Sequence, residues 1–331
     1  MTCSTPPSMP RPPRPACSTF RAGSAPVASA DPATDRPDPE DPSPEVIHQK
    51  PWELPGSDGA TIFGVAHHPQ LAPPHATPRG CVILCHGFKG YMDYGFLPRL
   101  ADAIARRGFE THRFNFSHSG VSRQHETFSY PNRFERDTWD RQVFDLQKVI
   151  TTHGRPHSRP VGIFGHSRGG VTALLASSRL RDAITAIVTA ASPADACRLD
   201  EDQRRQLRRD DRLASPSSRT GQTLYVGRAW LDEIEADPQA HDPLRAAARF
   251  PGHLLQVHGR DDATVPLHDL HRYAAANPRS QTRIIDHANH VFNASNPLPE
   301  DAPLPEVTAQ LFDATTDFFR ETLKPPPPDG R

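Results

Sequence analysis

A serine flanked by glycines is the clearest chemical feature of the sequence. The pentapeptide at 165–169, Gly-His-Ser-Arg-Gly, follows an apolar run at 161–164 and precedes an apolar helical pattern at 171–180. Between a strand and a helix, Gly-x-Ser-x-Gly is typical of a nucleophile elbow, in which a strained serine sits at a turn and the glycines let strand and helix approach. A plain glycine-rich loop is the alternative. We predict that Ser167 is a nucleophile.

A serine hydroxyl is a poor nucleophile near neutral pH and needs a base in contact, with an acid to orient that base. Candidates directly after predicted strands occur in the chain order Ser167, Asp262, His290. This order differs from those of the two large serine-protease folds. Asp261 and His287 are competing neighbours, but His287 directly follows its strand and leaves too little loop to reach a serine.

Strands and helices alternate along the part of the chain that must position these residues. The predicted strands lie at 46–49, 61–67, 81–85, 110–116, 161–164, 184–190, 253–257 and 282–286. The predicted helices lie at about 96–107, around Trp139, Val143, Phe144, Leu146 and Ile150, at 171–180, around Leu270 and Tyr273, and at 305–322. Such alternation predicts an α/β fold with a mostly parallel sheet, helices on both faces and reactive loops at the carboxyl ends of the strands.

Residues 192–250 interrupt this alternation, and an insertion of that length between two sheet strands is typical of a lid. It contains a charged helical stretch at about 200–213, the strand-like run 223–226 and a helical stretch at 228–236. Six arginines and five acidic residues are interleaved between 198 and 212, which predicts ion pairs Asp200/Arg204 and Glu201/Arg205. Such interleaving argues against nucleic-acid binding and favours a solvated face.

The ends of the chain have a different composition. Residues 1–45 contain 12 of the 37 prolines and almost no large apolar side chains, so we expect a disordered leader, followed by a catalytic domain at 46–324 and a proline-rich tail at 325–331. The N-terminus lacks the apolar segment of a secretory signal, no run is long enough for a membrane helix, and the net charge is −1. A cytoplasmic location is expected.

The five cysteines, Cys3, Cys17, Cys81, Cys85 and Cys197, have no Cys-x-x-Cys spacing, which indicates neither a disulfide framework nor a zinc–cysteine site. Cys81 and Cys85 lie four apart in a predicted strand and therefore about 13 Å from each other, too far to form a disulfide.

Four motifs in one order give the chain from about 46 to 323 a resemblance to the α/β-hydrolase superfamily. They are His86-Gly87-Phe88, the pentapeptide at 165–169, His258-Gly259-x-x-Asp262-x-x-Val265-Pro266 and Asn289-His290. Within that superfamily the set resembles the esterase and acyl-peptidase-like branch that includes cinnamoyl and feruloyl esterases. The fifth position of the third motif favours Asp262 over Asp261.

The resemblance implies a catalytic triad and an oxyanion hole. Ser167 would attack an acyl carbonyl, His290 would take and return the proton, and Asp262 would hold the imidazole. The backbone N–H groups of Phe88 and Arg168 would bind the oxyanion. His166 is expected to pack below the nucleophile and not to titrate.

The loop after the strand at 110–116 departs from the family pattern, because 115–122 keeps only part of a Gly-x-Gly-x-Ser sequence. His118, His125 and Phe128 are candidates for lining a substrate pocket, although a plain exposed loop is the favoured interpretation.

The function expected from these residues is hydrolysis of small carboxylic esters through an acyl-enzyme, without metal or organic cofactor. Thioester or peptide cleavage on the same triad is the first alternative. A non-catalytic binding module that keeps the fold is the alternative from another class. The sequence does not indicate the acyl group, the alcohol or the oligomeric state.

Overall fold

The computed structural model describes residues 44, 46–71, 77–124, 126–154, 159–180 and 182–324. The predicted leader at 1–45, apart from Pro44, and the predicted tail at 325–331 lie outside these residues, as does His125.

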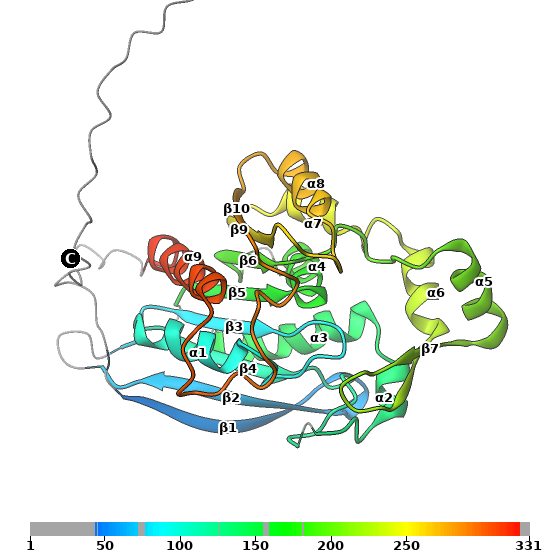
Figure 1. Cartoon of the computed structure of the whole chain (residues 1–331), viewed down its shortest axis with the longest axis horizontal. Helices are drawn as coiled ribbons and strands as arrows, with labels where there is room; N and C mark the ends of the chain where they lie inside the picture. Colours follow the sequence, from blue (N-terminus) through cyan, green and yellow to red (C-terminus); the bar gives the residue numbers. More distant parts are fainter. Residues whose placement is uncertain are drawn as a thin grey trace, which may run out of the picture. The chain divides into compact units, whose positions relative to one another are not determined.

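An eight-stranded sheet forms the centre of the described part of the chain (Figure 1). In spatial order its strands are β1 (Ile47–Pro55), β2 (Thr61–Pro69), β4 (Glu110–Asn115), β3 (Cys81–Cys85), β5 (Val161–His166), β6 (Ala186–Ala190), β9 (His253–Gly259) and β10 (Gln281–Ile285). The six strands from β4 to β10 run parallel, and β2 is antiparallel to β4. The predicted mostly parallel sheet is confirmed.

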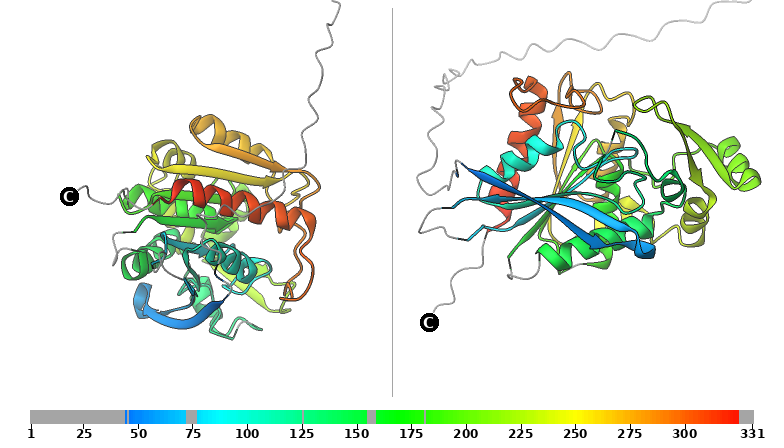
Figure 2. Two further views of the ribbon diagram at one scale, coloured as in Figure 1. Left: turned by 90° about the vertical axis from the view of Figure 1, so that its left-hand side faces the viewer. Right: turned by 90° about the horizontal axis from the view of Figure 1, so that it is seen from below.

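The strands predicted at 46–49 and 61–67 form an antiparallel hairpin at one edge of the sheet. β1 pairs with β2 in antiparallel register from Ile47 opposite Pro69 to Pro55 opposite Thr61, so β1 is longer than the sequence pattern predicts. A short 3-10 turn at Ser57–Gly59 connects the two strands. Figure 2 shows the hairpin, in blue, twisting along the sheet. Every residue of β3, β5 and β6 is buried, because helices cover both faces of these strands.

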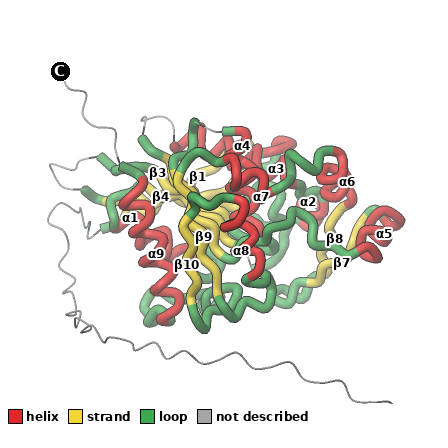
Figure 3. The backbone as a smooth tube through the Cα atoms, turned by 90° about the horizontal axis from the view of Figure 1, so that it is seen from above, coloured by secondary structure: helices red, strands yellow, loops and turns green. Residues whose placement is uncertain are grey.

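Helices cover the two faces of the sheet (Figure 3). α1 (Leu97–Arg106) and α9 (Glu306–Thr322) lie on one face, and α3 (Trp139–Val149), α4 (Arg168–Arg179), α7 (Pro243–Arg249) and α8 (His268–Ala276) lie on the other. Each face has its own apolar core. One contains Phe96, Leu100, Phe164 and Phe319, and the other contains Ile163, Trp139, Leu174 and Phe250.

The helix α3 differs from its predicted pattern at two points. Phe144 is 40% exposed, because it follows the buried Val143 by one residue and so lies about 100° further around the helix. The α-helix ends at Val149 and continues as a π-helical turn at Ile150–Gly154. Thr138 begins α3, and its side chain accepts a hydrogen bond from the N–H of Arg141.

The insertion between β6 and β9 contains the predicted charged helix α5 (Glu201–Asp210), the predicted strand β8 (Thr223–Gly227) and the predicted helix α6 (Arg228–Ala236). It also contains β7 (Arg212–Pro216), which pairs with β8, and α7, which packs on the main core.

The ion pairs on α5 differ from those predicted. Asp200 caps the helix in a reciprocal capping box with Gln203, so it is not free to pair with Arg204. Arg204 instead approaches Glu201 at 4.0 Å, and Arg205 pairs with Asp202, both at a spacing of three residues.

Cys81 and Cys85 are both buried free thiols, as expected from their separation along β3. Burial raises the pKa of each thiol far above its ordinary value. These thiols are therefore inert at neutral pH.

Candidate active site

Ser167 occupies the predicted turn between β5 and α4. Its backbone has φ 52° and ψ −121°, a conformation that residues other than glycine rarely adopt. Its N–H donates to the Ala190 carbonyl at 2.8 Å. A Cβ atom on Gly165 would lie 2.4 Å from the Gly169 oxygen, and one on Gly169 would lie 2.3 Å from the Cys85 oxygen. Both glycines are therefore required by close backbone contacts, as the sequence predicts.

His290 connects Ser167 to Asp262. Its Nε2 lies 3.1 Å from Ser167 Oγ, and its Nδ1 lies 2.8 Å from Asp262 Oδ2. An imidazole that donates from Nδ1 to the carboxylate leaves the Nε2 lone pair facing the serine hydroxyl. The structure thus brings the three predicted residues together in the geometry that a serine nucleophile and its base require.

Asp262 is held as a carboxylate. Burial opposes its ionisation, but hydrogen bonds from His258, from His290 and from the N–H of Val265 outweigh that effect, and the pKa of Asp262 lies well below its ordinary value. Asp262 Oδ1 also accepts a hydrogen bond from the N–H of Thr264, at 2.8 Å. A permanent negative charge at this position can stabilise an imidazolium on His290.

The competing residues Asp261 and His287 lie at the surface. Their side chains are 59% and 91% exposed, and His287 Nδ1 lies 3.8 Å from Asp261 Oδ2. Among the hydrogen bonds and ion pairs of the described residues, neither side chain contacts Ser167. The preference for Asp262 and His290 therefore agrees with the observed contacts.

His166 supports the loop that carries His290. Its Nε2 donates to the His290 carbonyl at 2.9 Å, and its ring packs edge-on against Phe96. Burial, together with the nearby His290, lowers the pKa of His166 to about 3. His166 therefore stays neutral and does not titrate near neutral pH. Its hydrogen bond to the His290 backbone joins segments 124 residues apart, and no local sequence pattern signals it.

The loop after β3 lies against Ser167. A Cβ atom on Gly87 would be 3.1 Å from Ser167 Cβ, so the loop backbone approaches the serine closely. His86 holds this loop, because its Nδ1 donates to the Gly87 carbonyl at 2.8 Å and its Nε2 accepts from the N–H of Phe116 at 3.4 Å. Burial lowers the pKa of His86 to about 4. The ring is therefore neutral near pH 7, with Nδ1 as the donor and Nε2 as the acceptor.

The two N–H groups predicted for the oxyanion hole lie in the segments beside Ser167. Phe88 follows Gly87 in the loop after β3, and Arg168 is the first residue of α4. Within the part of the chain that the structure describes, no backbone carbonyl accepts a hydrogen bond from either N–H. Both donors are therefore available to a ligand at the elbow.

The side chain of Arg168 is a site feature that sequence reasoning missed. Its guanidinium lies 3.0 Å from the buried Asp137 and within 6 Å of the ring centroids of Phe88, Trp139 and Trp230. Burial raises the pKa of Asp137 to about 6, although the charge of Arg168 opposes that shift. Trp230 belongs to α6, so the insertion contacts the residue that follows Ser167.

The two described candidates for a pocket lining are buried, so the favoured interpretation of an exposed loop is wrong for them. His118 Nδ1 lies 3.0 Å from both Ser57 Oγ and Ser117 Oγ, which ties the loop to the β1–β2 hairpin. Burial lowers the pKa of His118 to about 4. Phe128 packs with Phe134 of the short helix α2 (Pro131–Glu135) in a small apolar cluster. Hydrogen bonds therefore account for the burial of His118 and apolar packing for that of Phe128, whereas most of the described residues from 123 to 130 are exposed.

Within the described residues, no helix is both long and apolar enough to cross a membrane.

The fold and the elbow are those of an α/β-hydrolase. A family model described as serine aminopeptidase, S33, matches residues 76–246, which is more than half of the chain, and the chain belongs to that family of hydrolases. A comparison with curated proteins finds no match.

Solved structures of other hydrolases share the fold. Est1E from Butyrivibrio proteoclasticus with ferulic acid bound is 17% identical, with a TM-score of 0.64 over 82% of this chain and 98% of that one. A putative hydrolase from Agrobacterium vitis S4 is 17% identical, with a TM-score of 0.62 over 82% and 99%. Alpha/beta hydrolase domain-containing protein 10 from mouse is 15% identical, with a TM-score of 0.61 over 82% and 99%.

Proposed function

We propose that this protein is a serine esterase, which cleaves small carboxylic esters through an acyl-enzyme on Ser167. The observation that carries the proposal is the position of His290, whose two ring nitrogens lie 3.1 Å from Ser167 Oγ and 2.8 Å from Asp262 Oδ2. Membership of a serine hydrolase family adds support. The fold shared with Est1E, a structure solved with ferulic acid bound, agrees with this reaction class.

In the proposed reaction, Ser167 Oγ forms a bond to the ester carbonyl carbon while its proton passes to His290 Nε2. The negative charge that develops on the carbonyl oxygen is bound by the N–H groups of Phe88 and Arg168. The carbon–oxygen bond to the alcohol then breaks, and His290 returns the proton to the leaving oxygen. Water repeats the sequence on the acyl-enzyme and releases the carboxylic acid.

We assign catalysis to the domain at 46–324 and a lid role to the insertion at 192–250. The insertion contacts the loop of the proposed oxyanion hole, because Lys89 Nζ donates to the Pro216 carbonyl at 2.6 Å. It also meets the loop before α2, where the N–H of Phe128 donates to Gln222 at 2.8 Å. These contacts connect the insertion to both loops beside the elbow.

The test is substitution of the nucleophile. We expect Ser167→Ala to abolish hydrolysis of short p-nitrophenyl esters and labelling by a fluorophosphonate, while the melting temperature stays within a few degrees of wild type. A variant that keeps more than about a tenth of the wild-type rate would refute the assignment. Wild-type protein that takes up no fluorophosphonate would favour a non-catalytic binding module.

The family description names aminopeptidases, so peptide cleavage is measured in the same experiment. Matched acyl groups presented as oxygen ester, thioester and aminoacyl anilide separate the three leaving groups on one proposed triad. We expect the oxygen ester to give the highest kcat/KM. A higher kcat/KM on the anilide would reassign the enzyme as a peptidase.

A further inference from the structure

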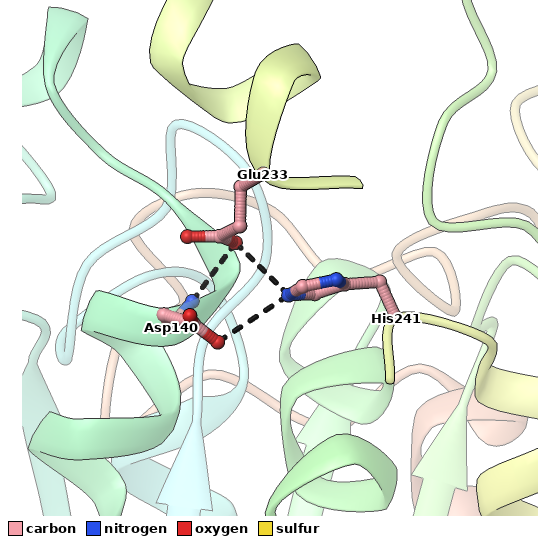
Figure 4. Close-up of side chains that lie close together, drawn as sticks. All are labelled: Asp140, Glu233 and His241. Atoms are coloured by element: carbon pink, nitrogen blue, oxygen red, sulfur yellow. Dashed lines mark hydrogen bonds and ion pairs between the residues drawn. The ribbon is translucent and has the colours of Figure 1, made fainter. Parts of the chain in front are cut away.

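Three potential metal ligands from separate segments meet where the insertion contacts α3 (Figure 4). Asp140 lies in the first turn of α3, Glu233 lies on α6, and His241 lies between α6 and α7. His241 Nε2 is 3.3 Å from Asp140 Oδ1 and 3.3 Å from Glu233 Oε1. All three ligand atoms lie within 4.8 Å of one another.

The other nitrogen of His241 determines which atom faces the carboxylates. Nδ1 lies 2.9 Å from the Asp237 carbonyl, which can only accept, so Nδ1 carries a proton and donates. In a neutral ring this leaves the Nε2 lone pair directed at two negative oxygens. That arrangement is unfavourable unless a cation lies between them. A metal-binding histidine usually donates from its second ring nitrogen to a carboxylate, a backbone carbonyl or water, and His241 has such a carbonyl.

The separations around His241 Nε2 also fit a metal ion as that cation. A hydrogen bond from a charged nitrogen to a carboxylate is about 2.7–2.9 Å long. Both contacts of His241 Nε2 are longer, at 3.3 Å. Ligand atoms about 2.0–2.1 Å from a tetrahedral Zn²⁺ lie about 3.3–3.4 Å from each other. The two observed separations match that tetrahedral edge.

We propose that Asp140, Glu233 and His241 bind a Zn²⁺ ion that fastens the insertion to the body of the domain. His241 is 4% exposed and Glu233 is 14% exposed, whereas Asp140 is 50% exposed. The exposed side offers an entry path and room for water as the fourth ligand. Glu233 Oε1 also accepts from the N–H of Asp140 at 3.0 Å, which holds that carboxylate against α3.

Arg179 of α4 is the competing cation at this cluster, because it pairs with Asp140 Oδ1. Its side chain is 40% exposed and can move into solvent when the metal takes that oxygen. Asp140 has a second oxygen that can continue to accept from Arg179. The competition weakens binding but leaves the His241 and Glu233 ligand atoms in place.

The experiment uses the full chain after chelator treatment and follows Zn²⁺ binding by calorimetry and by thermal melting. We expect one Zn²⁺ per chain and a rise in melting temperature of about 5–10 °C at a hundredfold excess over Kd. Mg²⁺ is expected to give neither effect. His241→Gln and Glu233→Gln are each expected to weaken binding at least tenfold. Glu235→Gln, on the same helix but paired with Arg208, is the matched control and is expected to bind as wild type.

Co²⁺ substitution identifies the ligands independently. The proposed site predicts a tetrahedral Co²⁺ spectrum without a thiolate charge-transfer band, since it contains no cysteine. Zn²⁺ binding that is absent in wild type, or equal in wild type and His241→Gln, would overturn the proposal. A thiolate band would also overturn it, because it would place the metal on cysteine. If no metal binds while His241 stays paired with Asp140 and Glu233, then His241 is a protonated ring that bridges the two carboxylates.

Discussion

The strained backbone of Ser167 permits a prediction that separates its conformation from its chemistry. Ser167→Gly and Ser167→Ala both remove the hydroxyl, so neither should hydrolyse esters. They differ only in the Cβ atom, which at φ 52° and ψ −121° is held in a conformation that glycine adopts freely. We therefore expect the glycine variant to be the more stable of the two, which reverses the usual order of glycine and alanine.

The size of this difference comes from opposing effects. Relief of backbone strain is worth about 1–3 kcal/mol. Against it stand the greater freedom of glycine in the unfolded chain, about 0.4–1 kcal/mol, and the loss of one half-buried methyl group, about 0.4 kcal/mol. The net gain is about 1 kcal/mol in favour of glycine. For a domain of this size that corresponds to about 2–3 °C in melting temperature.

The assay is thermal melting of both variants with a matched pair at Ser215. Ser215 is also half-buried but lies in the extended strand β7, so there we expect alanine to be more stable than glycine. Opposite signs at the two positions would support the reasoning. If Ser167→Ala melts at or above Ser167→Gly, the inference of strain at the elbow is wrong.

Two further outcomes are expected. Asp262→Asn should lower kcat about 10⁴-fold with little change in KM, because the amide can stabilise the wrong tautomer of His290. The control variant Asp261→Asn should keep a kcat within a few fold of wild type. Equal losses of kcat in the two variants, measured by steady-state kinetics, would contradict the assignment of Asp262. The free energy of unfolding should fall as the pH is lowered from 6.5 towards 4, since in that window the unfolded chain binds protons that buried histidines in the folded state do not. Among the histidines, burial lowers the pKa of His86, His118 and His153 to about 4 and that of His166 to about 3. These four outnumber Asp137 and Asp145, whose raised pKa of about 6 acts in the opposite direction. Urea midpoints that do not change over this range would refute the expected balance.

Local signals explain why the sheet and the elbow are predictable from sequence. The apolar run at 81–85 marks a strand covered on both faces, and the glycines around Ser167 mark a turn with close backbone contacts. Asp262 and His290 follow predicted strands, and parallel strands bring their carboxyl ends to one edge. Periodicity, turn chemistry and chain order suffice for these inferences, except that the choice of Asp262 over Asp261 also needed the motif shared with the family.

Contacts between distant segments explain what sequence reasoning missed. Arg168 contacts Asp137, which lies outside the insertion, and Trp230, which lies inside it. Neither residue belongs to a recognisable sequence motif. The strand β7, Arg-Leu-Ala-Ser-Pro, has neither an alternating apolar pattern nor a β-branched residue, so its pairing with β8 is decided by tertiary context. Phe144 is apolar but faces solvent, because it lies outside the stripe of α3 that packs against the core.

The aromatic surroundings of Arg168 give the protein a built-in optical probe. Of the three tryptophans in the chain, Trp139 and Trp230 both lie within 6 Å of this guanidinium, one from the body and one from the insertion. A displacement of α6 or a ligand that moves Arg168 would change the polarity around both indoles. Intrinsic emission therefore reports directly on the boundary between the insertion and the elbow, without any attached dye.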